Sequence, residues 1–253
     1  KIIISVRDLS FSYGSKKVFE NISFNIENGS KVALWGKNGS GKTTMLNLIA
    51  ACEDERIYIV PKAKLGYYHQ AFENLCMEKT VLGNVMETSV QTETVARTIL
   101  ARLLIAGDDV YKKVGVLSGG ERIKVSFAKL IVSDYNVLMF DEPTNFLDLQ
   151  SVEALENVLA SYQGTVLFVS HDSRFVNTVA EKLLVFQDNI VTEFDGKLDE
   201  YLNKESGTEK SDTERLLIEM ELASIAAEIA QPNSDKEALE QEYNKLAAKL
   251  RQL

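Results

Sequence analysis

The stretch WGKNGSGKTT, residues 35–44, combines closely spaced glycines with a lysine and two threonines. Its spacing is G-x-x-x-x-G-K-T, the pattern of a phosphate-binding loop. Fixing a glycine costs backbone entropy, so a cluster of glycines indicates a loop whose contacts exclude side chains. Backbone N–H groups of such a loop can surround phosphates, with the lysine at the β- and γ-phosphates and the threonine hydroxyl on Mg²⁺. We therefore predict that phosphates bind at Gly36, Lys37, Asn38, Gly39, Ser40, Gly41, Lys42, Thr43 and Thr44.

Two adjacent carboxylates, Asp141 and Glu142, follow an apolar run in the stretch NVLMFDEP. This pattern is typical of a buried strand that ends in polar residues at one edge of a sheet. Beside a phosphate loop, the aspartate can hold Mg²⁺ through its coordination shell, and the glutamate can polarise an attacking water. Adjacent acids after a strand otherwise form a solvated turn, and the phosphate loop in the same chain favours the functional interpretation.

A second anion-binding element is predicted in VLSGGERIKV, where a serine and two glycines stand at the start of a helical stretch. One nucleotide does not require two separate phosphate-binding elements from the same chain. The LSGGE sequence resembles the signature motif of ATP-binding cassette (ABC) ATPases, which caps the γ-phosphate held by the opposite domain. The resemblance covers about residues 2–200 and implies two cassettes that enclose two ATP molecules. It assigns nucleotide contacts to Ser118, Gly119, Gly120 and Glu121.

Four further residues match elements of the same family. Tyr13 resembles the aromatic side chain that stacks on adenine, although a structural strand tyrosine is the alternative. Gln70 resembles the glutamine that meets Mg²⁺ and the attacking water, and Asp148 in NFLD resembles the loop at the dimer seam. His171, in VSHDSRF, resembles the histidine that contacts the γ-phosphate, and His69 has no predicted role.

Taken together, the resemblance implies an ATPase with ATP and Mg²⁺ as its cofactors. The implied catalytic residues are Glu142, His171, Gln70 and Lys42, and the implied metal ligands are Thr43, Gln70 and Asp141. An isolated domain is expected to hydrolyse ATP weakly, because a partner cassette completes the site.

Short apolar runs at residues 2–5 and 31–35 predict strands, and alternating residues between them predict a hairpin. The phosphate loop then lies between strand KVALW and a helix that continues from TMLNLIA. NVLMFDEP and GTVLFVSHD predict further buried strands, so we expect a largely parallel sheet with ligands at its carboxyl edge. The predicted fold class is α/β, a P-loop NTPase core of ABC type with an antiparallel β subdomain.

Two helical segments are predicted outside this core. Residues 78–133 carry apolar side chains at helical spacing and are expected to form a helical subdomain inserted into an ATPase domain of residues 1–204. Residues 205–253 contain two heptad-patterned stretches around QPNSD, which predict an antiparallel coiled-coil hairpin. A partly disordered tail, or helices packed on the body, is the alternative.

Composition agrees with a protein of the cytoplasm. The net charge of −9 argues against binding nucleic acid with the whole surface. The only cysteines, Cys52 and Cys76, have no metal-ligand spacing and are expected to be reduced, buried or half-buried thiols. No apolar run approaches the roughly 20 residues that span a bilayer, so direct membrane insertion is not expected. Because the chain begins at Lys1, we expect it to be part of a longer protein.

Within the ABC family, three details favour the ABC-F branch. Only about 28 residues separate Lys42 from Gln70, which is short for a transporter cassette. DEPTNFLD and SHDSRF resemble ABC-F sequences, and a charged helical hairpin follows the cassette in several members. ABC-F proteins carry two cassettes in tandem and act on the ribosome, either in translation or in protection from antibiotics. The implied partners are therefore a second cassette, in the same parent chain or in a homodimer, and the ribosome through the parent protein.

Two other classes compete with this interpretation. The chain resembles, less closely, the detachable ATPase subunit of a membrane transporter, which would be held at membranes by a partner. Cassette heads of DNA-repair and chromosome-organising ATPases are split by a very long coiled coil, and none interrupts residues 44–117. The sequence leaves open whether the parent is a translation factor or a resistance protein, and which drugs would be involved.

Overall fold

The computed structural model describes residues 1–68 and 74–204. The chain divides into two compact units, Lys1–Leu198 and Asp199–Leu253. The predicted coiled-coil hairpin, together with Gln70 and His69, lies outside the described residues. In the described part of the chain, no helix is both long and apolar enough to cross a membrane.

A three-stranded antiparallel sheet opens the first unit. Its strand order is β2-β1-β4, formed by β1 (Ile2–Tyr13), β2 (Lys16–Glu27) and β4 (Ile57–Ile59). Strand β1 is longer than the predicted strand of residues 2–5, because it continues past irregularities of register between Val6 and Leu9. The predicted hairpin is confirmed, since β1 and β2 pair antiparallel around a tight turn.

A six-stranded sheet forms the centre of the unit, in the order β5-β6-β7-β3-β8-β9. All its neighbours pair parallel except β8 and β9. The prediction of a largely parallel sheet is therefore confirmed. The predicted strands are found as β3 (Lys31–Gly36), β6 (Val137–Asp141) and β7 (Thr165–Val169), whereas β5 (Leu65–Tyr68), β8 (Lys182–Gln187) and β9 (Ile190–Asp195) were not predicted.

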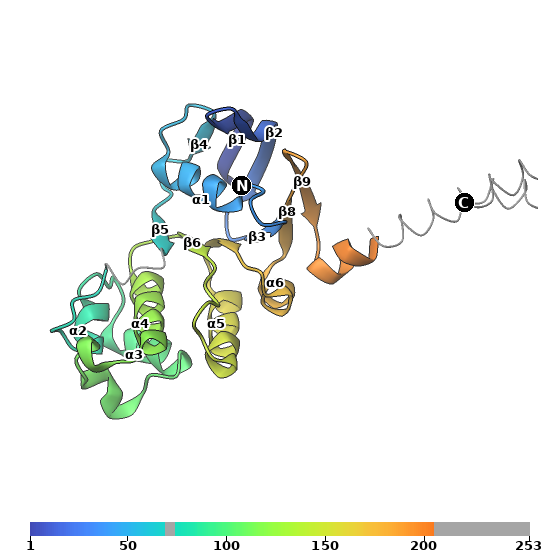
Figure 1. Cartoon of the computed structure of the whole chain (residues 1–253). Coiled ribbons are helices and arrows are strands. Elements are labelled where there is room, and N and C mark those ends of the chain that lie inside the picture. The colour runs from blue at the N-terminus through green and yellow to red at the C-terminus, as the bar shows by residue number, and fades with distance from the viewer. Residues whose placement is uncertain (69–73, 205–253) are drawn as a thin grey trace, which may run out of the picture. The chain divides into compact units, whose positions relative to one another are not determined.

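Helix α1 (Lys42–Ala51) lies between the two sheets, and α4 (Gly119–Val132), α5 (Leu149–Ser161) and α6 (Ser173–Val179) cover the other face of the six-stranded sheet (Figure 1). The connection from β5 to β6 is helical, as predicted. Besides α4, it contains α2 (Val81–Met86), α3 (Glu93–Arg102) and the short 3₁₀ turns η1 (Gly107–Tyr111) and η2 (Val114–Val116).

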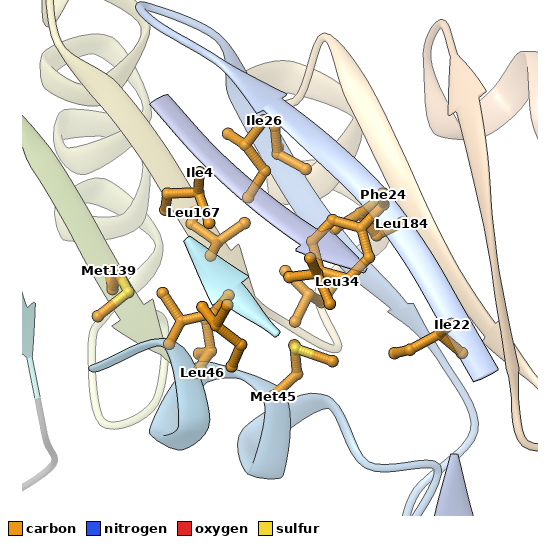
Figure 2. Packing of buried hydrophobic residues seen from close by; sticks show 14 of the residues in the cluster. Ile4, Ile22, Phe24, Ile26, Leu34, Met45, Leu46, Met139, Leu167 and Leu184 are labelled. Atoms are coloured by element: carbon orange, nitrogen blue, oxygen red, sulfur yellow. The ribbon is translucent and has the colours of Figure 1, made fainter. Parts of the chain in front are cut away.

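The apolar core joins the two sheets through α1. Figure 2 shows Met45 and Leu46 of this helix in one cluster with Ile4 of β1, Leu34 of β3 and Leu167 of β7. All five side chains are fully buried. Burying each aliphatic side chain of this size contributes about 1.5–3 kcal/mol relative to exposure, so the start of α1 is fixed firmly against both sheets.

Both cysteines are free and exposed, which corrects the prediction that they are buried or half-buried. Cys52 follows the last turn of α1 with φ 49°, and this left-handed conformation ends the helix and turns the chain away from the core.

Candidate nucleotide-binding site

The turn between β3 and α1 positions the predicted phosphate loop. Val32, Ala33 and Leu34 of β3 are fully buried, because the strand lies between β7 and β8 in the middle of the sheet. Helix α1 begins at Lys42, and its N-cap residue Gly41 has φ 103°. A Cβ atom on Gly41 would lie 2.5 Å from Val18 Cγ1, so glycine is required both by the backbone angle and by the space.

The chain has therefore the strand, loop and helix that a phosphate-binding loop requires. The first N–H groups of α1 have no partner within the helix, and its dipole presents partial positive charge at the same end. This arrangement favours the binding of an anion at the N-terminus of α1.

Lys42 folds back over the loop. Its Nζ donates to the carbonyl oxygens of Gly36 at 2.8 Å and Lys37 at 2.9 Å. Burial lowers the pKa of Lys42, while the nearby charges of Glu142 and Asp141 act in the opposite direction. The ammonium group is thus held over the loop, near the carboxylates of Asp141 and Glu142.

The acids reach the loop because of the strand order. Strand β7 alone separates β3 from β6, so the carboxyl ends of these two strands are about 10 Å apart. Thr43 at the start of α1 bridges this gap, and its Oγ1 donates to Asp141 Oδ1 at 3.2 Å. A hydroxyl and a carboxylate oxygen are hard ligands of the kind that Mg²⁺ prefers, and Mg²⁺ commonly completes its shell with waters and substrate phosphates. The residues therefore fit a Mg²⁺ ion.

Glu142 follows Asp141 in a left-handed backbone conformation, with φ 51°. Its backbone N–H donates to Val169 O at 2.9 Å. Its side-chain Oε2 accepts from the backbone N–H of His171 at 3.2 Å. His171 Nε2 lies 3.2 Å from Glu142 Oε1, a contact that is an ion pair whenever the imidazole is protonated and that makes no hydrogen bond. Within the described residues, Oε1 is therefore a buried carboxylate oxygen without a hydrogen-bond partner. Such an oxygen is available to accept from a bound water.

These side chains line one cavity of about 570 Å³. It contains ten of the residues predicted from the sequence: Tyr13, Asn38, Gly39, Gly41, Lys42, Thr43, Thr44, Asp141, Glu142 and His171. Gly36, Lys37 and Ser40 complete the loop but do not line the cavity. The volume lies within the range that is typical of small-molecule sites.

Sequence reasoning missed three residues that line the same cavity, Lys16, Val18 and Val169. Lys16 and Val18 belong to β2, which turns back directly after Tyr13. The signal that could have found Lys16 was the hairpin itself, since a two-residue turn places Tyr13 and Lys16 opposite one another.

The predicted signature motif and Asp148 do not line the cavity. Ser118 caps α4 in a reciprocal capping box with Glu121, and hydrogen bonds from Ser118 lower the pKa of that glutamate. Asp148 caps α5, where its Oδ1 accepts from the Ser151 N–H at 2.7 Å. Both groups therefore hold helix N-termini that are separate from the phosphate loop of their own chain.

The fold and the cavity define a P-loop nucleotide-binding domain with an antiparallel β subdomain and a helical insertion. Residues 19–145 match the sequence profile of the family described as ABC transporter. The chain belongs to this family of ATP-binding cassette proteins.

Two relatives indicate the branch. The ribosome protection protein VmlR of Bacillus subtilis (strain 168) is 32% identical over 258 residues, which cover 100% of this chain and 46% of VmlR. ABC transporter F family member 5 of Arabidopsis thaliana is 33% identical over 219 residues, which cover 84% of this chain and 32% of that protein. The chain thus spans less than half the length of either relative. The predicted resemblance to ABC-F proteins is confirmed.

A solved structure supports the fold. The cassette MJ0796, in a dimeric post-hydrolysis state bound to ADP and Pi, superposes with a TM-score of 0.61 at 23% identity. The superposition covers 76% of this chain and 98% of MJ0796. The predicted ABC-type α/β fold with its antiparallel β subdomain is therefore confirmed.

Proposed function

We propose that this chain is the C-terminal cassette of an ABC-F protein and that it hydrolyses ATP to control the binding of its parent protein to the ribosome. The observation that carries the ATPase is the buried Oε1 of Glu142 in the cavity of the phosphate loop, which accepts no hydrogen bond from the described residues. The similarity to VmlR over the whole chain supports the ribosome as the target.

The residues of the cavity divide the work between binding and chemistry. The N–H groups of residues 36–44 hold the phosphates, and Lys42 turns from its own loop carbonyls towards the β- and γ-phosphates. Thr43, Asp141 and Gln70 would hold Mg²⁺, which when bound neutralises charge on the transferred phosphoryl group. Glu142 accepts a proton from the attacking water. The backbone N–H of His171 donates to Glu142, and the His171 side chain faces the γ-phosphate.

Ser118, Gly119, Gly120, Glu121 and Asp148 serve a partner's nucleotide in this proposal. The partner is a second cassette, either in the same parent chain or in another copy. ATP favours the closed pair because each nucleotide binds residues of both cassettes, and hydrolysis removes those contacts and reopens the pair. We place the parent protein in the cytoplasm, where ribosomes and ATP are available.

Ribosome co-sedimentation of the parent protein tests this function. Glu142→Gln, combined with its counterpart in the other cassette, keeps the side-chain shape but loses the carboxylate, so ATP stays bound. We expect this variant to pellet with ribosomes in ATP and to remain in the supernatant in ADP. The matched control is Glu153→Gln, an exposed glutamate that pairs with Arg174 on the surface. ATP-independent sedimentation with ribosomes contradicts the proposal. Retention at membranes through an integral partner also contradicts it and favours a transporter ATPase.

A further inference from the structure

Two loops meet at the wall of the nucleotide cavity. One loop follows β6 and begins with Glu142, and the other follows β7 and contains His171. Strands β6 and β7 are parallel neighbours, with Asp141 opposite Val169 at their ends. Glu142 and His171 both line the cavity. Because both residues lie beyond the last pair of the ladder, their spacing depends on how the two loops hold each other.

A pair of hydroxyl groups joins these loops from behind the cavity. Thr144 Oγ1 lies 3.3 Å from Ser170 Oγ, within hydrogen-bond distance. Ser170 is 1% exposed, and its Oγ also accepts from the backbone N–H of Asp172 at 3.1 Å. Neither Thr144 nor Ser170 is among the residues that line the cavity. The Ser170 hydroxyl therefore links the β6 loop to the residue that follows His171, without reaching the nucleotide.

Three consecutive residues of the β7 loop are thus attached to the β6 loop. The carbonyl oxygen of Val169 accepts from the Glu142 N–H, and the N–H of His171 donates to Glu142 Oε2. Ser170 stands between these two attachments and meets Thr144. The left-handed backbone of Glu142, with φ 51°, persists only where the surroundings fix it. The hydroxyl pair is a part of those surroundings that touches neither the water nor the phosphate.

Loss of either hydroxyl changes the geometry of this turn. A buried hydroxyl seeks a new partner when its own is removed, because bulk water does not reach it. Since Ser170 precedes His171 directly, a shift of its side chain or backbone moves the contact between His171 and Glu142. Misplacing reacting groups by about 1 Å can lower a rate by about 10²-fold. The phosphate loop lies between β3 and α1, outside this set of contacts.

We propose that Thr144 and Ser170 are positioning residues, which fix the distance between Glu142 and His171 during attack of the water. This inference rests on the proposed function, because it concerns the same hydrolysis. The two hydroxyls act through Glu142 and His171, so their loss lowers the rate of the chemical step and leaves the binding of nucleotide unchanged.

Phosphate release by the 253-residue chain, with equilibrium binding of ADP and Mg²⁺, tests the inference. Thr144→Val keeps the shape of the side chain and removes its hydroxyl, and Ser170→Ala removes the other hydroxyl. We expect each variant to lower kcat by about tenfold, as a displacement smaller than 1 Å does, with the affinity for ADP within about twofold. The double variant should be no slower than the slower single variant, because the pair acts as one unit. Thr144→Ser, which restores the hydroxyl, should recover most of the rate.

Thr178→Val is the matched control. Its hydroxyl is exposed and donates to Arg174 O within its own helix, at 2.9 Å, so its removal should leave kcat unchanged. An unchanged kcat in both Thr144→Val and Ser170→Ala overturns the inference, and so do losses that multiply in the double variant. A parallel loss of ADP affinity also overturns it, because the role is then a general one in folding. If the wild-type chain binds ADP but releases no phosphate from ATP, the proposed ATPase function itself fails, so the two failures are distinguishable.

Discussion

Glu142 is a mostly buried carboxylate with a left-handed backbone conformation in this cavity. Its side chain is 15% exposed, and its backbone is held in the left-handed region by the hydrogen bond to Val169. A non-glycine residue in this conformation costs free energy that the surrounding fold must supply. We infer that the cost is kept because it turns the carboxylate from the end of β6 towards the phosphate loop.

The first prediction concerns the chemistry of this side chain. Glu142→Gln is expected to lower the turnover of nucleotide by about 10²–10⁴-fold, because a positioned general base contributes that much. Nucleotide affinity should stay within about threefold, since the phosphate loop is unchanged. Release of inorganic phosphate and equilibrium binding are the two measurements. Glu153→Gln is the control with unchanged turnover, and an unchanged rate in Glu142→Gln would exclude the proposed base.

The second prediction concerns stability and pH. Glu156 on α5 is 5% exposed, and its Oε1 has no hydrogen-bond partner among the described residues. Burial raises the pKa of this carboxyl above its ordinary value of 4.5; Arg174 lowers the pKa, and Asp172 and Glu153 raise it. The folded state therefore holds its proton more tightly than the unfolded state. The stability that this proton provides is complete below pH 4.5 and is lost as the pH rises through the folded pKa.

Glu156→Gln should accordingly raise the free energy of unfolding at pH 7 by about 1 kcal/mol, because the buried charge is removed. The gain should disappear when urea unfolding is repeated near pH 4, where the carboxyl is protonated in both states. Glu53→Gln, at an exposed glutamate that follows α1, should show no such pH-dependent gain. A destabilised Glu156→Gln protein at pH 7 would contradict the sign of this argument.

At the scale of elements, the turn from β3 to α1 carries the third prediction. Gly41→Ala places a Cβ atom 2.5 Å from Val18 Cγ1 and 2.8 Å from Phe19 Cε1, at a φ of 103°. We expect a loss of about 2–4 kcal/mol in the free energy of unfolding, because the clash and the backbone strain act together. Gly119→Ala is the control, since its Cβ meets nothing within 4 Å and its residue begins α4. Chemical unfolding of both variants provides the comparison, and equal losses would refute the steric argument.

The elements also show what sequence could predict. The phosphate loop, Asp141 and His171 could be predicted to lie at one edge of the sheet. Each of them directly follows an apolar run, and such local patterns identify the strands of a parallel sheet. The predicted hairpin could have placed Lys16 opposite Tyr13, but the approach of that hairpin to α1, which brings both residues to the cavity, depends on tertiary packing. The left-handed backbone of Glu142 was equally hidden, since it depends on the contact with Val169 from a distant strand. Strands β8 and β9 were not predicted, because neither strand is followed by a recognisable polar motif such as those after β3, β6 and β7.

At the scale of the molecule, an apolar surface accompanies the motifs that lie outside the cavity. Val116, Phe146 and Leu149 are 72%, 81% and 64% exposed, and they stand next to the signature motif or to Asp148 in the sequence. A Cβ atom on Gly120 would lie 3.3 Å from the Phe146 carbonyl oxygen, so the two motifs are neighbours in space. Exposed apolar side chains that gather around binding motifs are typical of interaction sites.

The fourth prediction follows from this surface. The turnover per mole of chain should rise with protein concentration, because in the proposed function each nucleotide binds residues of two cassettes. Phe146→Ser should weaken that dependence and lower ATP-dependent self-association by about tenfold, as loss of a buried aromatic anchor does. Analytical ultracentrifugation and phosphate release measure the two effects. Ile190→Ser, an exposed apolar control on β9, should change neither. A rate of phosphate release strictly proportional to protein concentration, from nanomolar levels upward, would contradict this prediction.

Strands β5 and β6 run parallel as hydrogen-bonded neighbours, with Leu65 opposite Val137 and Tyr68 opposite Phe140. The intervening residues 69–136 therefore leave the sheet at one strand and return at the adjoining one. A segment attached in this way can change in length or sequence while β3, which precedes the phosphate loop, and β6, which ends at Asp141, keep their register. For protein engineering, this attachment makes residues 74–136 an exchangeable module, provided that the exchange retains residues 118–121, to which we assign contacts with a partner's nucleotide.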